Sequence, residues 1–125
     1  ELAELVCRWH IMLHQVGQLK NKTILTVLKK TDAFRRPERF AAALNVCIAD
    51  TQGRLNRENT PYPQRAYWLA LLEAANQVHS GKIAAECRAQ EKAHLIAEEI
   101  DRARLAQIAP LQKAFRAAQD KTERH

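Results

Sequence analysis

The sequence predicts an all-α fold, an irregular bundle of about five to six helices. Composition is the first reason, because the 125 residues include only 3 Gly and 4 Pro, with abundant Ala and Leu and few β-branched residues. Periodicity is the second reason, since apolar residues recur at helical spacing and no segment of strand length alternates between apolar and polar residues. A chain of this length forms one domain or part of one.

The first two helices are predicted over residues 1 to about 16, with Gly17 near the end, and from about Asn21 to about Thr31. The apolar residues of the first segment recur at helical spacing, as expected for an amphipathic helix. They are Leu2, Leu5, Val6, Trp9, Leu13 and Val16.

A turn is predicted at residues 32–36, because Pro37 restricts Arg36 to non-helical backbone angles and is itself well suited to begin a helix. The third helix therefore begins at Pro37, and we expect it to close at Gly53 in a left-handed C-cap. Residues 55–63 are polar and contain two prolines, which indicates a loop.

The C-terminal half is predicted to contain a helix from Pro63 that ends at Ser80-Gly81, then a short helical piece. A long helix follows from about Lys92. We expect Pro110 to kink or split this helix and residues 120–125 to be frayed.

Positive charge is concentrated in one part of the chain. The net charge is +6, and residues 20–39 hold most of the excess, with only Asp32 and Glu38 against the basic residues. These basic residues are Lys20, Lys22, Lys29, Lys30, Arg35, Arg36 and Arg39. Such a patch suits a phosphate-rich partner, and the alternative is a solvated helix face.

Cysteine usage and hydropathy point to a cytoplasmic protein. No apolar stretch is long enough for a membrane span, and no signal peptide is visible. The three cysteines, Cys7, Cys47 and Cys87, are widely spaced and odd in number, which favours reduced, buried thiols.

Catalytic motifs are missing from the residue pattern. We find no Gly-rich phosphate loop, no Ser/His/Asp set and no Cys/His cluster, so we expect no catalytic, cofactor or metal site in this chain. His10 and His14 have a spacing that can bind a metal, but the segment lacks the Glu of the zinc-protease motif. We expect a solvated, ion-paired face in the last helix at Glu98, Glu99, Asp101, Arg102 and Arg104.

Five motifs come in an order and spacing that can be compared with known families. They are Leu5-Val6-Cys7-Arg8-Trp9-His10 with His14, Asn21-Lys22-Thr23-Ile24, Asp32-Ala33-Phe34-Arg35-Arg36-Pro37-Glu38-Arg39, Ala49-Asp50 with Gly53-Arg54, and Tyr62-Pro63-Gln64. With them the chain resembles bacterial tRNA nucleotidyltransferases, the CCA-adding enzymes, of the type that carries an HD phosphohydrolase domain. The resemblance covers nearly all of residues 2 to 108.

The resemblance implies that the chain is the C-terminal helical arm of a larger enzyme, as its start at Glu1 inside a predicted helix also suggests. Residues 1–19 are then the last helix of the preceding HD-like domain, and residues 20–125 are a tRNA-binding arm. The parent adds C, C and A to tRNA from CTP and ATP with Mg²⁺, in a head domain outside this chain. Active HD members resemble this chain except that they carry Asp where Ile11 stands, so we expect the parent to lack phosphohydrolase activity.

Several basic residues are candidates for tRNA contact. The principal ones are Lys29, Lys30, Arg35 and Arg36, and the further ones are Arg39, Arg54, Arg57 and Arg65. For Arg39, a structural ion pair involving Glu38 or Asp50 is the alternative. For the chain as a whole, the alternatives are a metal-dependent phosphohydrolase domain that uses His10 and His14, and a dimerisation module that forms a homodimer.

Overall fold

The computed structural model describes residues 2–53 and 61–123, and it confirms the all-α prediction. These residues form six α-helices and two short 3₁₀ helices, with no strand among them. The elements, in chain order, are α1 (Leu2–His14), η1 (Val16–Gln18), α2 (Asn21–Lys30), α3 (Pro37–Gln52), α4 (Pro63–Asn76), α5 (Ser80–Ala89), η2 (Ala93–Leu95) and α6 (Ile96–Glu123).

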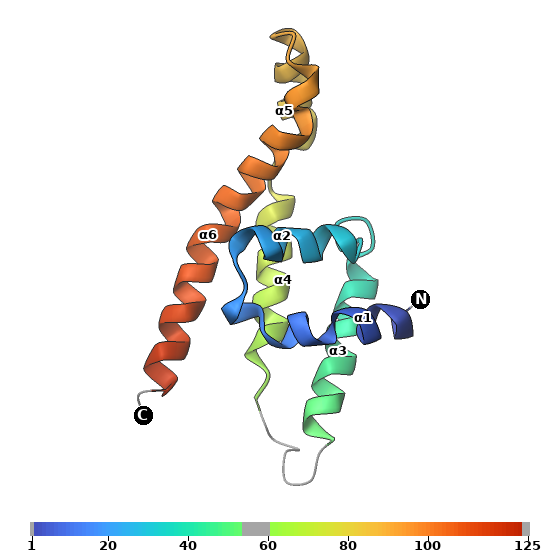
Figure 1. The fold of residues 1–125 in the computed structure, drawn as a ribbon, viewed down its shortest axis with the longest axis vertical. Helices are drawn as coiled ribbons and strands as arrows, with labels where there is room; N and C mark the ends of the chain where they lie inside the picture. Colours follow the sequence, from blue (N-terminus) through green and yellow to red (C-terminus); the bar gives the residue numbers. More distant parts are fainter. Residues whose placement is uncertain (1, 54–60, 124–125) are drawn as a thin grey trace.

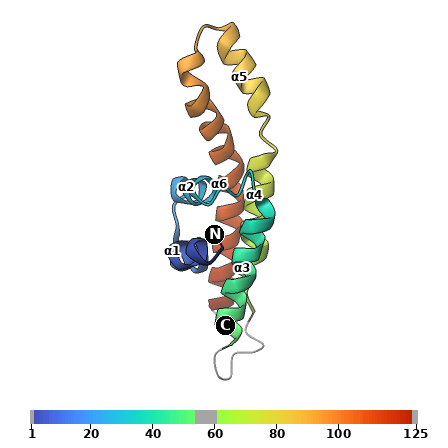
Figure 2. The same cartoon turned by 90° about the vertical axis from the view of Figure 1, so that its right-hand side faces the viewer.

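Helix α6 is the longest element and runs along most of the molecule, with α4 packed against it (Figure 1). Helices α1 and α2 lie crosswise to α3 and α4, where α1 contacts α3 and α2 contacts α6. Helix α5 and the first turns of α6 form a hairpin that projects beyond the other helices (Figure 2). The molecule therefore has two parts, a body and a projecting hairpin.

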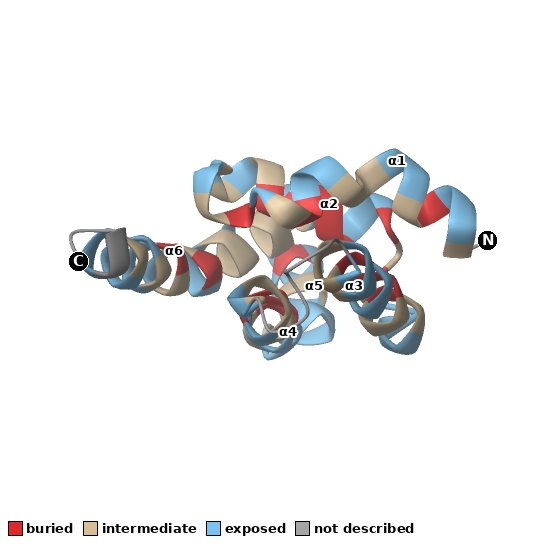
Figure 3. Cartoon of the chain, turned by 90° about the horizontal axis from the view of Figure 1, so that it is seen from below, coloured by how far each residue is buried: buried red, intermediate tan, exposed pale blue. Residues whose placement is uncertain are grey.

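The hydrophobic core lies inside the body, where buried segments of several helices face one another (Figure 3). Trp68 and Phe40 are its largest fully buried side chains, and their rings meet edge to face with 5.7 Å between centroids. Fully buried aliphatic residues from α1, η1, α2, α3, α4 and α6 surround them: Leu13, Val16, Ile24, Leu28, Leu44, Leu71 and Ile108. The apolar faces of the body helices thus form a single core.

Helix α3 ends at Gln52, so its predicted closure at Gly53 is confirmed, but the predicted left-handed cap and one other helix boundary are wrong. Gly53 has φ −74°, which is right-handed, and its N–H donates to the carbonyl of Ala49 at 2.8 Å as a further helical bond does. Ser80-Gly81 begins α5, whereas α4 already ends at Asn76. Ser and Gly are favoured at a helix start as well as after a helix end, so the pair by itself does not distinguish the two.

The last helix begins at Ile96, after η2, which is later than the predicted start at Lys92, and it also ends later than predicted. It is continuous from Ile96 to Glu123, so Pro110 does not split it and its end is not frayed up to that residue. Pro110 lacks the N–H that would bind the carbonyl of Ala106, but both residues are exposed, so water can satisfy that carbonyl. On the other side, Ile108 and Gln112 are buried against the body. Neither this helix nor any other described one is long and apolar enough to cross a membrane.

Two helices are followed by a non-glycine residue whose backbone is in the left-handed conformation. Asp32 follows α2 and Glu91 follows α5, each with φ 59°. After α2, the N–H of Asp32 donates to the carbonyl of Lys29 at 3.1 Å, and the N–H of Ala33 donates to that of Leu28 at 3.0 Å, the Schellman pattern. This conformation costs a non-glycine residue roughly 1–2 kcal/mol. The burial of Ala33 in the core offsets that cost and holds the turn.

The buried amide of Gln112 joins three elements. Its Nε2 donates to the carbonyls of Val16 and Leu19 at 3.1 and 2.6 Å, and its Oε1 accepts a hydrogen bond from the hydroxyl of Tyr67. Gln112 is only 2% exposed. Because an unpaired polar group would be costly at such a site, these bonds fix α4, α6 and η1 relative to one another.

Other side chains of α4 and α6 donate hydrogen bonds to further backbone carbonyls at the end of α1 and around η1. Trp68 Nε1 donates to the carbonyl of Leu13 at 2.9 Å, and Gln64 Nε2 donates to that of His14 at 3.1 Å. The Arg116 guanidinium donates to the carbonyls of Gly17 and Leu19 at 2.9 and 2.7 Å. The end of a helix leaves such carbonyls without backbone partners, and here the partners come from distant helices. We call residues 13–19 with these four side chains, Gln64, Trp68, Gln112 and Arg116, the η1 joint.

Gln112→Ala is expected to destabilise the fold by about 2–4 kcal/mol, because the carbonyls of Val16 and Leu19 and the Tyr67 hydroxyl all lose a buried partner. Urea denaturation followed by circular dichroism measures this change. Gln107→Ala is the matched control at an exposed position of the same helix, and less than about 0.5 kcal/mol is expected there. Similar effects of the two substitutions would contradict the role given to Gln112.

Candidate nucleic-acid interface

The segment between α2 and α3, residues 32–36, presents two arginines to solvent, and we call it the basic turn. Ala33 is fully buried and Phe34 packs against the core, whereas Arg35 and Arg36 are exposed. The apolar side chains of the segment thus anchor it, and the anchoring directs both guanidinium groups outward.

The exposed cations of this region have few partners within the described residues. The Arg35 guanidinium lies 3.8 Å from the carboxylate of Asp32, and its side chain remains 83% exposed. Lys30 and Arg36 are exposed and form no ion pair among the described residues. A loosely held arginine and two unpaired cations leave this surface positive and accessible to an anion.

Arg39 is oriented differently from its neighbours. Its Nη2 donates to the carbonyl of Thr31 at 2.7 Å, its side chain is half-buried, and its Nε is buried without a hydrogen-bond partner. Glu38 and Asp50 are exposed, and neither forms an ion pair with Arg39 in the part of the chain that the structure describes. Arg39 therefore ties α3 to the end of α2.

The remaining candidates are dispersed. Arg65 on α4 donates from Nε to Oδ1 of Asn45 on α3 at 2.8 Å. Arg54 and Arg57 lie outside the described residues. The structure consequently brings Lys29, Lys30, Arg35 and Arg36 into one region and leaves Arg65 on another pair of helices.

Sequence reasoning missed the role of Arg104 in this region. Its guanidinium carbon lies 4.1 Å from the centroid of the Phe34 ring, a cation–π contact between α6 and the basic turn. The expected solvated ion pair is wrong for this residue, because Arg104 is half-buried and forms no ion pair among the described residues. The two residues are far apart in the chain, so no local pattern indicated their contact.

A cleft of about 480 Å³ lies between α2 and α6. Lys29 Nζ is 3.1 and 3.3 Å from the two carboxylate oxygens of Asp101, and their side chains are 47% and 36% exposed. Lys22 and Arg102 also line the cleft. The predicted ion-paired face of α6 is confirmed for Arg102 and Glu99, which pair on the same helix, whereas Asp101 pairs with Lys29 on α2.

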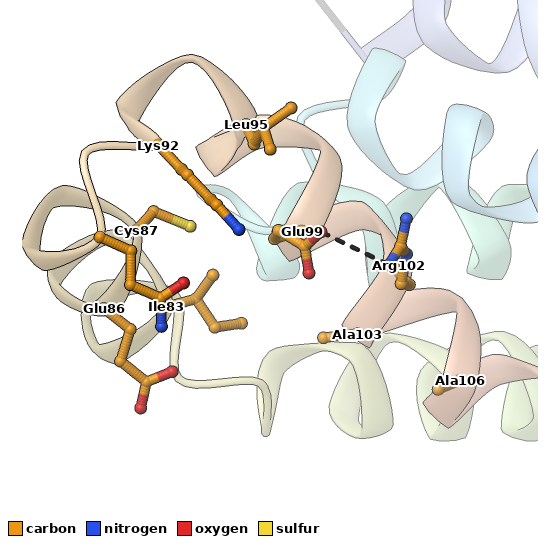
Figure 4. Close-up of a pocket in the computed structure, with 10 residues that line it drawn as sticks. Ile83, Glu86, Cys87, Lys92, Leu95, Glu99, Arg102, Ala103 and Ala106 are labelled. Carbon is orange, nitrogen blue, oxygen red and sulfur yellow. Dashed lines mark ion pairs between the residues drawn. The ribbon is translucent and has the colours of Figure 1, made fainter.

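A second cavity, of about 460 Å³, lies in the hairpin between α5, η2 and the start of α6 (Figure 4). The side chain of Lys92 extends into it beside the buried Cys87. Arg102 and Glu99 form an ion pair at 3.5 Å on its α6 side. Cations and carboxylates are mixed around this cavity, so it does not extend the positive surface of the basic turn.

The two histidines of α1 contact a tyrosine hydroxyl and a backbone carbonyl. His14 Nδ1 lies 3.0 Å from the Tyr62 hydroxyl, and His10 Nδ1 lies 3.1 Å from a backbone carbonyl one turn earlier. Ile11, between them in sequence, is 59% exposed. Among residues 2–53 and 61–123, no group of three or more His, Cys, Asp or Glu side chains is placed to hold a metal ion.

Comparison with known proteins shows that the whole chain is similar to part of longer proteins. It is 89% identical over 125 residues to the multifunctional CCA protein of Neisseria meningitidis serogroup B. The aligned region is 100% of this chain and 30% of that protein. The multifunctional CCA protein of Chromobacterium violaceum is 43% identical over 116 residues, 93% of this chain and 28% of that protein. The chain thus spans less than a third of the length of these relatives, and the resemblance stated for its motifs is confirmed.

Two other comparisons give no match. No family model matches the chain, and no solved structure is similar to it at a significant level.

Cys7 is expected to be alkylated at least about ten-fold faster than Cys47 at pH 8. Cys7 is exposed, whereas Cys47 is buried and burial raises its pKa above the usual 9.0. The same shift means that the folded state holds this proton more tightly, so stability is expected to fall as the pH rises above about 9. Mass spectrometry of labelled peptides over time measures the alkylation rates of both cysteines, and equal rates would contradict the burial of Cys47.

Proposed function

We propose that this chain, which matches a segment of multifunctional CCA proteins along its whole length, is the helical arm with which a tRNA nucleotidyltransferase holds its tRNA. The observation that carries the proposal is the basic turn, where Arg35 and Arg36 are exposed while Ala33 is buried. Duplex RNA is recognised largely through its shape, phosphates and 2′-hydroxyls, because its major groove is too narrow to read. Outward arginine forks on a rigid helical support suit that kind of recognition.

The proposed contacts follow from how each cation is held. Lys30, Arg35 and Arg36 are the most available, and Lys29 becomes available when its partner on α6 is displaced. Arg39 supports the basic turn through Thr31. Secondary contacts are proposed for Arg54, Arg57 and Arg65.

The parent protein, in this proposal, is a cytoplasmic enzyme that adds C, C and A to the tRNA 3′ end from CTP and ATP with Mg²⁺. The chain contributes the positioning of tRNA and no catalytic group. Residues 1–19 are proposed to end the preceding helical domain, and residues 20–125 to form the arm. The η1 joint, which ties that helix to α4 and α6, supports such a coupling of the two parts.

The double substitution Arg35→Ala/Arg36→Ala is expected to weaken tRNA binding roughly ten-fold or more, because two phosphate contacts are lost. The slope of log affinity against log salt should become less steep by about 1.4–1.8. Gel-shift titrations with a tRNA that lacks its 3′ CCA, over a salt series, measure both quantities.

The matched control also removes two positive charges, but from a part of the chain away from the basic turn. Lys113 and Lys121 are exposed near the C-terminal end of α6, so Lys113→Ala/Lys121→Ala should change the affinity less than about two-fold. Binding of an unstructured RNA as tightly as tRNA, or binding that does not depend on salt, would count against the proposed function.

The expectation drawn from Ile11, that the parent lacks HD-type phosphohydrolase activity, stays a prediction. The name of the relatives describes multifunctional proteins, which does not favour it. Assay of the longer protein against 2′,3′-cyclic nucleotides with added divalent metal tests it directly. Little or no turnover is expected, and robust hydrolysis would contradict the prediction.

One observation favours the alternative of a dimerisation module. Three large apolar residues are exposed on α1 and α3, namely Ile11, Met12 and Val46, at 59%, 37% and 40%. Light scattering decides this alternative, since a homodimer doubles the mass in solution.

A further inference from the structure

We infer that the cleft between α2 and α6 is a phosphate subsite in which Asp101 competes with RNA for Lys29. An RNA phosphate that enters the cleft displaces the Asp101 carboxylate from the Lys29 ammonium group. The inference rests on the proposed function and extends it. It adds Lys22 and Arg102 to the RNA-binding surface and gives Asp101 the role of setting the affinity.

The α2 wall of the cleft carries polar groups along one helical face. Lys22, Thr26 and Lys29 follow one another at spacings of four and three residues, which places them above one another on the helix. All three are exposed. Thr26 donates its hydroxyl proton to the carbonyl of Lys22 at 2.9 Å, and the Lys29 ammonium group is held by Asp101.

The α6 wall carries opposite charges next to each other. Asp101 holds Lys29 at 3.1 Å, while the neighbouring Arg102 has a side chain that is 76% exposed and lies 3.5 Å from Glu99. With Lys22 and Glu98, three cations and two carboxylates line the cleft. Lys22 forms no ion pair among the described residues. Asp101 is therefore the group that most directly opposes an anion in the cleft.

An exposed ion pair contributes little net free energy, so a phosphate can replace the carboxylate at Lys29. The displaced Asp101 stays on α6 beside the phosphate and repels it. A free anion gains too little in the cleft to overcome this repulsion. An RNA strand that is already held by Arg35 and Arg36 brings its next phosphates to the cleft at a high local concentration.

Asp101→Asn is the decisive substitution, because the amide keeps the shape and removes the competing charge. In the protein that carries this chain, it is expected to tighten tRNA binding roughly 3- to 10-fold and to steepen the salt slope by about 0.7–0.9. In the background of Lys29→Met the same substitution is expected to change the affinity less than about two-fold, since the double-mutant cycle isolates the coupling of the two side chains.

Asp120→Asn is the matched control. It makes the same change of net charge on the same helix, 19 residues away, which is about 28 Å along the axis. An affinity gain equal to that of Asp101→Asn would overturn the inference in favour of a general effect of net charge. Thermal denaturation of each variant checks that the fold is retained.

Two further outcomes separate the possible failures. Unchanged tRNA binding by Asp101→Asn, in a protein whose wild-type form binds tRNA, overturns this inference alone, whereas absence of tRNA binding by the wild type contradicts the proposed function as well. A different outcome is that inorganic phosphate raises the melting temperature of the wild type but not that of Lys29→Met. If Lys29→Met also leaves the tRNA affinity unchanged, the inference is overturned in favour of a free-anion site.

Discussion

The buried amide of Gln112 is the constraint on which the body of this molecule depends. It must keep its bonds to Val16, Leu19 and Tyr67, because water cannot reach it. Side chains that follow η1 by tens of residues donate hydrogen bonds to carbonyls of η1 and of the residues on either side of it. The position of α6 relative to α4 is therefore fixed by polar bonds as well as by apolar contact.

The positive surface depends on this joint through α2. The chain leaves the joint at Leu19 and enters α2 two residues later, so the joint sets where α2 lies across α6. At the other end of α2, Arg39 bonds the carbonyl of Thr31, and Arg104 covers Phe34. The basic turn is thus held by a backbone bond on one side and by an aromatic contact on the other.

The sequence predicted well what local chemistry determines. Pro37 marked the start of α3, and the charge pattern identified Arg35 and Arg36, which are exposed. Long-range partners were not predictable, because helical periodicity gives the face of a residue but not its neighbour. The pairing of Lys29 with Asp101 spans 72 residues. Asp32 ends α2 in a left-handed conformation that usually indicates glycine, so the position gave no recognisable signal.

The continuity of α6 through Pro110 has a mechanical consequence. A helix of 28 residues is about 42 Å long at 1.5 Å per residue, and its two ends belong to different parts of the molecule. The hairpin and the η1 joint therefore lie on one stiff rod. A force applied at the tip of the hairpin is transmitted along α6 to the η1 joint, and the distance between the two ends of the helix stays constant. In the tRNA-binding role proposed above, the hairpin and the η1 joint would thus be two points held at a fixed separation.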